Sequence, residues 1–256
     1  MPNALPATLL DRVHIVLVEP QHPGNIGAAA RAMKTMGLGR LHLVRPREFP
    51  SPEADARAAG AEDLLLHADV APDLVSATAG ISLMLGTSAR RRGVALPEHT
   101  PREAATLLLA GAALGEVALV FGAERTGLTN DELARCQGAV RIPTDPVFSS
   151  LNLAAAVQVL CYELRVAALA ATAAAEATTP RRLAADDQPA TVAELEGLFG
   201  HLERALDAIA FFKGRSPVTI MRRLRRLYHR AAPSRREVLI LRGILSEAER
   251  SARAGH

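Results

Sequence analysis

Polar side chains that could do chemistry follow several apolar runs, where buried strands would end. Asn25 and Arg31 follow the first such run, Glu124 follows a later one, and Ser149 and Ser150 follow the last. Taken singly, a serine at a helix start is commonly an N-cap, and a lone charged side chain is commonly solvated. Their shared position matters more, because the carboxyl ends of parallel strands line one crevice where ligands bind. A guanidinium at such an edge could stabilise developing negative charge.

The elements that would position these residues alternate along the chain. Capping boxes at 100–103 and 129–132 begin helices, and 150–172 forms one long Ala-rich helix. This alternation predicts an α/β domain with a mostly parallel sheet. The apolar runs that we expect to be its buried strands are 13–18, 41–44, 81–85, 117–121 and 140–142.

The stretch PQHPGNIGAAARAMKTMG after the first strand is not a common nucleotide cradle. Its glycines, Gly24 and Gly27, are spaced GxxG, and the second strand ends in VRP with no acid to bind a ribose. A dinucleotide fingerprint requires GxGxxG and such an acid. No GK[ST] motif is present, so we exclude a P-loop as well as an ordinary NAD or Rossmann methyltransferase site.

Composition divides the chain into three parts. Residues 1–172 carry the α/β pattern, 173–190 read as a linker, and 191–256 contain three helices that we expect to open at Thr191, Ser216 and Ser234. The last part has 13 Lys and Arg against 7 Asp and Glu, a net charge of +6, within a chain whose net charge is +3. On charge alone, this excess fits either a polyanion partner or a solvated helical face.

Bulk composition excludes several classes of protein. The 256 residues are 49% apolar but only 3% aromatic, which disfavours aromatic sheets of the kind that stack RNA bases. Cys136 and Cys161 are far apart and match no metal-binding spacing, so we expect neither a disulfide nor a metal site. The N-terminus lacks the features of a signal peptide, and no apolar run of about 18 residues is free of charge. We therefore expect a soluble, cytoplasmic protein that does not enter the membrane.

Three motifs resemble those of one known family. NIGAAARAM, LVFGAERTGL and SSLNLAAAVQV resemble the three motifs of the SPOUT RNA ribose methyltransferases, in order. GTSARRR and the tail segments FGHLERAL, RRLRRLYHRA and LILRGILS extend the resemblance to bacterial members that methylate tRNA nucleotide 32. The resemblance implies a parallel sheet with helices on both faces and a C-terminal trefoil knot, followed by a small helical extension. It also implies a homodimer with each active site near the partner subunit.

The resemblance further implies the cofactor and the site residues. S-adenosyl-L-methionine would lie in the knot against Thr87, Ser88, Ala89, Gly122, Ile142, Ser149, Ser150 and Leu151. We expect Gly122 to let the ligand approach the backbone, and Ile142 and Leu151 to supply apolar walls.

The catalytic residues implied by the resemblance are Arg31, Asn25, Glu124 and Ser150. Arg31, set among Ala28, Ala29, Ala30 and Ala32, would meet the ribose 2′-hydroxyl, with the alanines leaving room for a nucleotide. Because a guanidinium stays protonated, we expect it to stabilise the alkoxide while Ser150 or water takes the proton. Asn25 would orient a loop or the substrate, and Glu124 would hold an arginine or a loop.

Phosphate contacts complete the sequence-based hypothesis. Candidate RNA-binding residues are Arg90, Arg91, Arg92, Arg222, Arg223, Arg225 and Arg226. The implied reaction is 2′-O-methylation of cytidine or uridine 32 in the tRNA anticodon loop. The alternatives left open are methylation of rRNA or of another tRNA position, a non-catalytic RNA-binding module, and a small-molecule enzyme.

Overall fold

A computed structural model describes residues 9–89, 96–175 and 187–254 of the chain. Its centre is a seven-stranded, fully parallel sheet with the strand order β3-β2-β1-β6-β4-β7-β5. The carboxyl ends of β6, β4 and β7 therefore lie side by side at one edge. The strands are β1 (Val13–Val18), β2 (Arg40–Val44), β3 (Asp69–Ala71), β4 (Ile81–Thr87), β5 (Glu98–His99), β6 (Glu116–Phe121) and β7 (Gly138–Val140).

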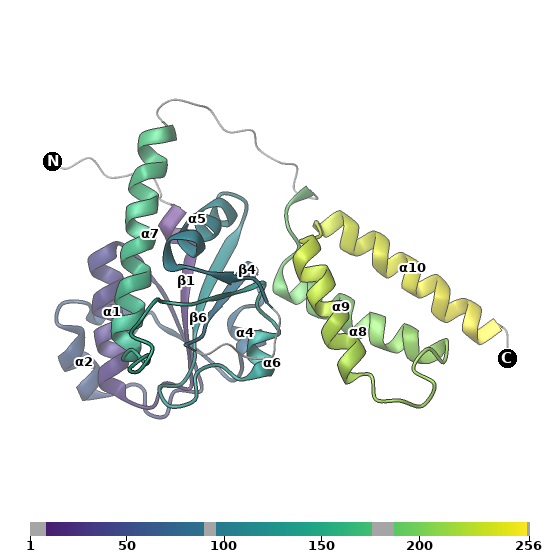
Figure 1. Ribbon diagram of the computed structural model, residues 1–256, viewed down its shortest axis with the longest axis horizontal. Helices are drawn as coiled ribbons and strands as arrows, with labels where there is room; N and C mark the ends of the chain where they lie inside the picture. The colour runs from purple at the N-terminus through teal and green to yellow at the C-terminus, as the bar shows by residue number, and fades with distance from the viewer. Residues whose placement is uncertain (1–8, 90–95, 176–186, 255–256) are drawn as a thin grey trace.

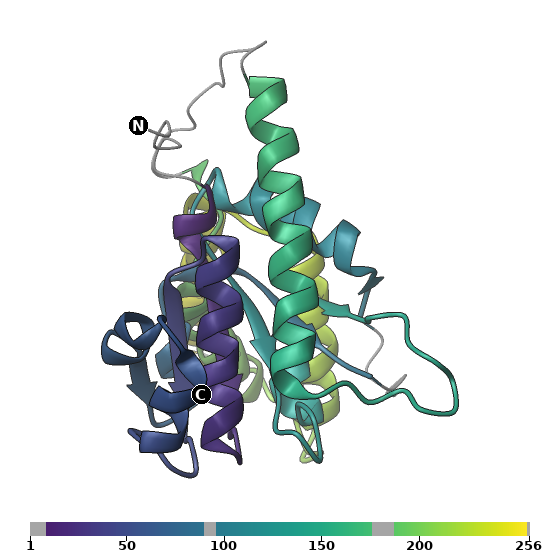
Figure 2. The same cartoon turned by 90° about the vertical axis from the view of Figure 1, so that its left-hand side faces the viewer.

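Helices cover both faces of the sheet, as expected for its class (Figures 1 and 2). On one face lie η1 (Leu9–Arg12), α1 (Pro23–Met36), α5 (Pro101–Ala112) and α7 (Leu153–Ala175), with α2 (Pro52–Ala58) and α3 (Glu62–Leu66) outside α1. On the other face lie α4 (Leu74–Ala77), α6 (Asn130–Leu133) and the start of α8 (Val192–Ala208). The α/β prediction is confirmed.

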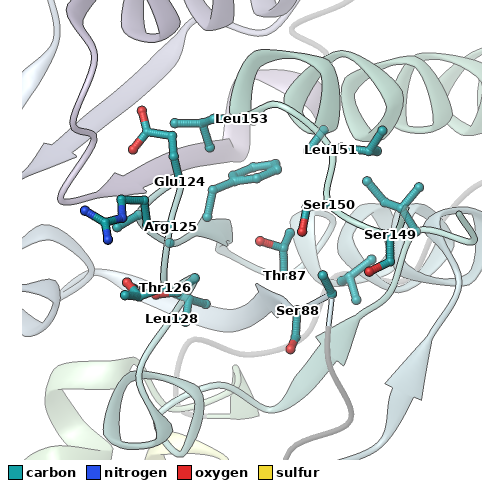
Figure 3. A pocket seen from close by; sticks show the side chains of 18 of the residues that line it. Thr87, Ser88, Glu124, Arg125, Thr126, Leu128, Ser149, Ser150, Leu151 and Leu153 are labelled. Carbon is teal, nitrogen blue, oxygen red and sulfur yellow. Dashed lines mark hydrogen bonds between the residues drawn. The ribbon is translucent and has the colours of Figure 1, made fainter. Parts of the chain in front are cut away.

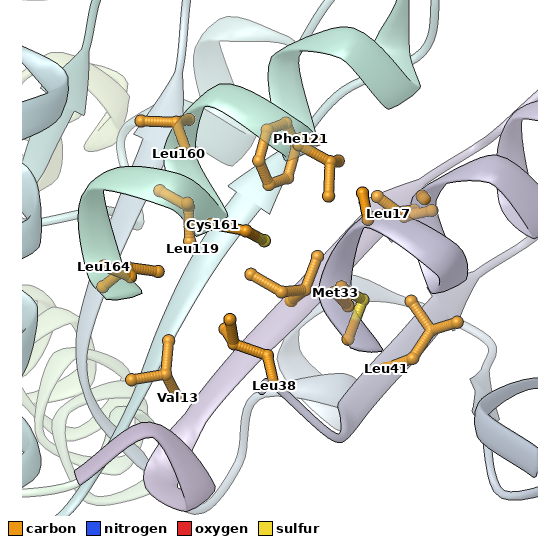
Figure 4. Close-up of a cluster of buried hydrophobic side chains, with 14 of the residues drawn as sticks. Val13, Leu17, Met33, Leu38, Leu41, Leu119, Phe121, Leu160, Cys161 and Leu164 are labelled. Atoms are coloured by element: carbon orange, nitrogen blue, oxygen red, sulfur yellow. The ribbon is translucent and has the colours of Figure 1, made fainter. Parts of the chain in front are cut away.

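The larger core lies between the sheet and helices α1, α5 and α7. Alternate residues of β1 and β6, such as Val13, Leu17, Leu119 and Phe121, meet Met33 there, and all are at most 1% exposed (Figure 4). Burying a side chain of this size is worth about 1.5–3 kcal/mol. This packing orients α1 and α7 relative to the strand ends.

Small residues in α1 allow close helix packing. A Cβ on Gly27 would lie 1.9 Å from the carbonyl oxygen of Ala54 in α2, so no larger residue fits there. Ala29, Ala30 and Ala32 are buried in the same core. The expectation that these alanines leave room for a nucleotide is therefore wrong for these three positions, because α2, α7 and the sheet fill that space. Of the four alanines, only Ala28 is half-buried.

The expected strands match the sheet except at its edges. The runs at 13–18, 41–44, 81–85 and 117–121 are confirmed to within two residues, whereas the last expected strand, 140–142, lies two residues earlier at β7. Two short edge strands, β3 and β5, were not expected. Helix α7 begins at Leu153 and reaches Ala175, three residues beyond the predicted end.

Three helices form the C-terminal part, namely α8, α9 (Val218–Ala231) and α10 (Arg235–Ala254). The expected capping box at Thr191 and the reciprocal hydrogen bonds between Ser234 and Glu237 are confirmed. The expected cap at Ser216 is wrong, because the N-cap of α9 is Pro217, which has no side-chain hydrogen bond. Much of the proposed linker, 176–186, lies outside the described residues.

The C-terminal helices dock on the sheet beside β4 and α6. Val192 is 2% exposed in the second core with Leu128 and Leu133, and the amide of Ala193 donates to the carbonyl of Ala79 at 3.2 Å. The side chain of Glu196 then meets Arg135, which lies between α6 and β7, at 3.0 Å. The extension is therefore joined to the α/β domain by both apolar and ionic contacts.

Helix α7 satisfies the length and composition of a membrane span over Leu153–Ala173, and 28% of that segment is buried inside the protein. The segment contains Glu163 and Arg165, and its Val157, Leu160 and Leu164 belong to the core under the sheet. A single such helix is weak grounds for a membrane span, because the core helices of globular proteins satisfy the same criterion.

Candidate functional site

A pocket lies where β4, β6 and β7 end (Figure 3). Its lining comes from the end of β4, the loop that follows β6, and the segment between β7 and α7. All eight residues expected to contact the cofactor line it: Thr87, Ser88, Ala89, Gly122, Ile142, Ser149, Ser150 and Leu151. The structure thus brings these residues together, while their role remains a prediction.

Gly122 has a packing role that the sequence did not indicate. A Cβ at this position would lie 2.1 Å from the backbone nitrogen of Leu128 and 2.2 Å from the carbonyl carbon of Gly127. The loop folds back there, since the amide of Gly127 donates to the carbonyl of Ala123 at 2.7 Å and Gly127 has a φ of 64°. Residue 122 must therefore be glycine because a side chain would collide with the residue's own loop. This need does not depend on a ligand.

Glu124 joins this loop to the start of α1. Its carboxylate accepts hydrogen bonds from the Asn25 amide (2.9 Å) and from the backbone amides of Gln21 (2.9 Å) and His22 (3.3 Å). Burial alone would raise the pKa of the Glu124 carboxyl, but these hydrogen bonds outweigh it and lower the pKa below the ordinary value. The negative charge also lies at the helix N-terminus, where the helix dipole favours it. Glu124 thus holds a loop in place, one of the two roles expected for it.

Asn25 lies within the first turn of α1. Its Oδ1 accepts a hydrogen bond from the Asn152 side chain at 2.9 Å, and Asn152 in turn caps α7 by accepting from the amide of Ala154 at 2.9 Å. The hydrogen bonds between Glu124, Asn25 and Asn152 therefore connect all three sequence motifs. The sequence places Asn152 at a helix start beside Ser149 and Ser150, but the sequence-based hypothesis gave it no role in the site.

Arg31 lies apart from this network. It is exposed on α1, six residues beyond Asn25, and it is absent from the lining of the pocket. Within the described part of the chain, no side chain or backbone group forms a hydrogen bond or an ion pair with its guanidinium. The structure does not bring Arg31 to the pocket of its own chain.

The pocket also carries groups that sequence reasoning passed over. Arg125 and Thr126 line it, and both residues are exposed. The Thr144 hydroxyl donates to the backbone carbonyl of Ser149 at 3.0 Å and so closes the base of the loop between β7 and α7. Ser150 is exposed, and its side chain points into the space beside Thr87 (Figure 3). Arg125 could have been identified from the sequence, because it directly follows Glu124 at the end of a strand.

The basic residues expected to contact RNA differ in their surroundings. Arg90, Arg91 and Arg92 lie outside the described residues. Arg223 and Arg226 are exposed on α9, and Arg222 pairs with Asp131 of α6 at 2.8 Å.

Arg225 is engaged within the chain. Its guanidinium forms two hydrogen bonds with the Glu196 carboxylate and lies 4.5 Å from the centre of the Phe199 ring. Only 22% of its side chain is exposed. This placement gives Arg225 a structural contact rather than a free charge for phosphate.

The two thiols and the possible metal ligands offer no second site in the part of the chain that the structure describes. Burial raises the pKa of both Cys136 and Cys161 to about 12. Among the described residues, no group of three or more His, Cys, Asp or Glu side chains is placed to hold a metal ion.

Comparison with known proteins assigns the class. A model described as the SpoU rRNA Methylase family matches residues 12–162. A second, described as the tRNA methyltransferase TrmJ C-terminal domain, matches residues 193–256. The chain belongs to the SpoU methylase family, and the resemblance seen in the sequence is confirmed.

Particular relatives are similar over nearly their whole length. The chain is 52% identical over 250 residues to the tRNA (cytidine/uridine/adenosine-2′-O-)-methyltransferase TrmJ of Pseudomonas aeruginosa (strain UCBPP-PA14), covering 96% of each chain. It is 48% identical over 245 residues to the tRNA (cytidine/uridine-2′-O-)-methyltransferase TrmJ of Salmonella typhimurium (strain LT2), covering 94% of this chain and 98% of that one. The crystal structure of TrmJ from Z. mobilis ZM4 matches with a TM-score of 0.79 and 38% identity, covering 92% and 98% of the two chains.

Proposed function

We propose that this protein transfers the methyl group of S-adenosyl-L-methionine to the ribose 2′-hydroxyl of cytidine or uridine 32 in the anticodon loop of tRNA. The observation that carries the proposal is the pocket at three strand ends, braced by Glu124, Asn25 and Asn152. The relatives named tRNA 2′-O-methyltransferases supply the substrate class. The bound cofactor would supply an electrophilic methyl group, and the protein would supply orientation.

The residues present suit this cofactor. Ile142 and Leu151, together with Leu128, Val140 and Leu153, offer apolar walls for an adenine ring. The backbone of the loop over 122–127 would supply hydrogen bonds to polar groups of the ligand. Thr87 and Ser88 at the end of β4 add hydroxyls to the lining.

Arg31 and Ser150 would act on the reacting oxygen. When bound in the pocket, the cofactor would supply the methyl group for the ribose 2′-oxygen and remain as an uncharged thioether, and the hydroxyl proton would be lost. Ser150 or a water molecule receives that proton, since a guanidinium remains protonated. The positive charge of Arg31 stabilises the oxygen as negative charge develops on it.

A homodimer would complete the site. Arg31 is exposed and absent from the pocket of its own chain, so it would serve the pocket of a second copy. Tyr162, Val166 and Leu169 are exposed on α7, which packs beside α1, and they would form part of the dimer interface. Light scattering coupled to gel filtration tests this assembly, and a purely monomeric enzyme with full activity would contradict it.

The remaining assignments accompany this function. The segment from β7 to α7 would pass through a loop of the chain as a trefoil knot, consistent with the strand order β6-β4-β7 and the return of α7 to α1. We assign 1–172 to the methyltransferase domain, 173–190 to a linker and 191–256 to the RNA-binding extension, and we place the enzyme in the cytoplasm with its tRNA substrate. Arg90, Arg91, Arg92, Arg223 and Arg226 would contact phosphates, and Arg222 would do so on leaving Asp131.

The test is methyl transfer to total tRNA from a strain that lacks the enzyme, followed by mapping of the modified ribose. We expect one 2′-O-methyl group, on nucleotide 32. Arg31→Ala should abolish transfer while the cofactor dissociation constant stays within about threefold, because Arg31 would act on the ribose 2′-oxygen rather than on the cofactor. Arg57→Ala, at an exposed arginine of α2, is a matched control.

Each other outcome has a definite meaning. Methylation of rRNA alone, or of another tRNA nucleotide, would replace the proposed substrate. RNA binding without detectable cofactor binding would favour a non-catalytic module. Full turnover by Arg31→Ala would remove Arg31 from the mechanism.

A further inference from the structure

The loop between β7 and α7 carries two consecutive apolar side chains at its tip. Val147 is 94% exposed and Phe148 is 82% exposed. Among the described residues, no other aromatic side chain is exposed to this degree. Val147 and Phe148 together form an exposed apolar tip in a chain with only 3% aromatic residues.

The loop holds this tip in a defined shape. One carboxylate oxygen of Asp145 accepts hydrogen bonds from the amides of Val147 (2.8 Å) and Phe148 (2.9 Å). The hydrogen bond from Thr144 to Ser149 closes the base of the same loop. The ring is therefore presented outward on a braced turn, which lowers the entropy lost when a partner stacks on it.

The tip is continuous with the pocket. Thr144 and Ser149, on either side of the tip, both line the pocket, as does Ser150. Two residues of extended chain span at most about 7 Å, so the backbone of Phe148 lies within that distance of Ser150. The ring can therefore reach a nucleotide whose ribose lies at the pocket.

The chemistry of this edge favours a nucleic acid as the partner. Arg125 lines the pocket and Arg141 follows β7, and both are exposed cations. An apolar ring beside guanidinium groups is the combination that binds single-stranded RNA, because bases stack on rings and phosphates pair with cations. Among the described residues, Phe121 is the one aromatic residue in the pocket lining, and it is 1% exposed in the core, so it cannot stack on a base.

We propose that Phe148 stacks on the unpaired base of the nucleotide that is methylated, and so positions its ribose at the pocket. This inference rests on the proposed function. It makes Phe148 a substrate-binding residue that accepts more than one base, because every base has a flat apolar face. Base choice would then depend on other contacts.

The test compares Phe148→Ala, Phe148→Leu and Phe148→Tyr with the neighbouring control Val147→Ala. Tyr keeps the aromatic ring, Leu keeps an apolar side chain without a ring, and Val147→Ala removes an apolar side chain that is more exposed than Phe148. The measurements are kcat and KM for tRNA, tRNA binding by filter retention, and the cofactor dissociation constant. Loss of one stacked base predicts a roughly 5- to 150-fold rise in KM and weaker tRNA binding for Phe148→Ala.

The expected order of tRNA affinity is wild type and Phe148→Tyr above Phe148→Leu, with Phe148→Ala lowest. The tRNA affinity of Val147→Ala should stay within about twofold of wild type. The cofactor dissociation constant of every variant should also stay within about twofold. A tRNA KM within twofold of wild type for Phe148→Ala would overturn the inference. So would dissociation of a dimer by Phe148→Ala, which would assign the tip to an interface between copies.

The binding assay separates this inference from the proposed function. If the wild-type protein binds tRNA but transfers no methyl group to it, the proposed function fails. Loss of binding in Phe148→Ala alone would then still support stacking, and unchanged binding would refute it.

Discussion

Glu196 joins the C-terminal extension to the rest of the protein. Its carboxylate pairs with Arg135 from the α/β domain at 3.0 Å and with Arg225 from α9, and 19% of its side chain is exposed. Burial alone would raise the pKa of Glu196, but the hydrogen bond from Arg225 and the charges of both arginines outweigh it and lower the pKa. The ionised form is therefore the one that stabilises the fold.

Glu196→Gln keeps the shape of the side chain and removes its charge, leaving two guanidinium groups close together. Removing one partner of a buried ion pair lowers the free energy of unfolding by about 3–5 kcal/mol. Because the side chains of Arg135 (31%) and Arg225 (22%) are partly exposed, we expect Glu196→Gln to lower it by about 2–3 kcal/mol. The arginines of α9 also lose their fixed position relative to the pocket. We therefore expect weaker tRNA binding with an unchanged cofactor dissociation constant.

The assay is urea unfolding followed by circular dichroism, together with tRNA binding. Glu247→Gln is the matched control, because Glu247 is 63% exposed in a surface pair with Arg250. This substitution should lower the free energy of unfolding by less than about 0.5 kcal/mol. Equal stability of the two variants would refute the reasoning, and so would wild-type tRNA affinity in Glu196→Gln.

Three further predictions concern other parts of the fold. Gly122→Ala should destabilise the protein and weaken cofactor binding in thermal-shift assays, since its Cβ would lie 2.1 Å from the Leu128 nitrogen; an unshifted Tm would contradict this. Cys136 and Cys161 should resist iodoacetamide at pH 8 in the native state and react only in urea, as read by mass spectrometry, because burial raises their pKa to about 12. Burial, and then the charge of Arg225, lowers the pKa of His229 to about 4. Below pH 6.5 the unfolded state therefore binds a proton that the folded state does not, and from pH 7 to 5 wild type should lose about 2 kcal/mol more stability than His229→Gln.

The central strands could be predicted from the sequence because they are buried on both faces. The apolar run of β1, for example, has five of its six residues buried. The edge strands β3 and β5 could not be predicted, since Asp69 and Val70 are exposed and β5 is only Glu98–His99. Gly138 and Ala139 have low β-propensity, so the strand was expected at 140–142 instead of at β7.

The place of the candidate site at the strand ends could be predicted from the alternation of strands and helices, whereas the individual cofactor residues could be predicted only through family resemblance. The resemblance located the eight pocket residues, which come from three segments far apart in the sequence. The contacts that brace the site could not be foreseen, because Glu124 meets Asn25 across 99 positions and Asn152 meets Asn25 across 127. Spacing likewise said nothing about the position of Arg31 relative to the pocket of its own chain.

A crystal structure with S-adenosylhomocysteine tests the central claim most directly. We expect the ligand among the ends of β4, β6 and β7, with its adenine between Ile142 and Leu151 and its sulfur facing Ser150. Ordered ligand at any other place, with this pocket empty, would contradict the account.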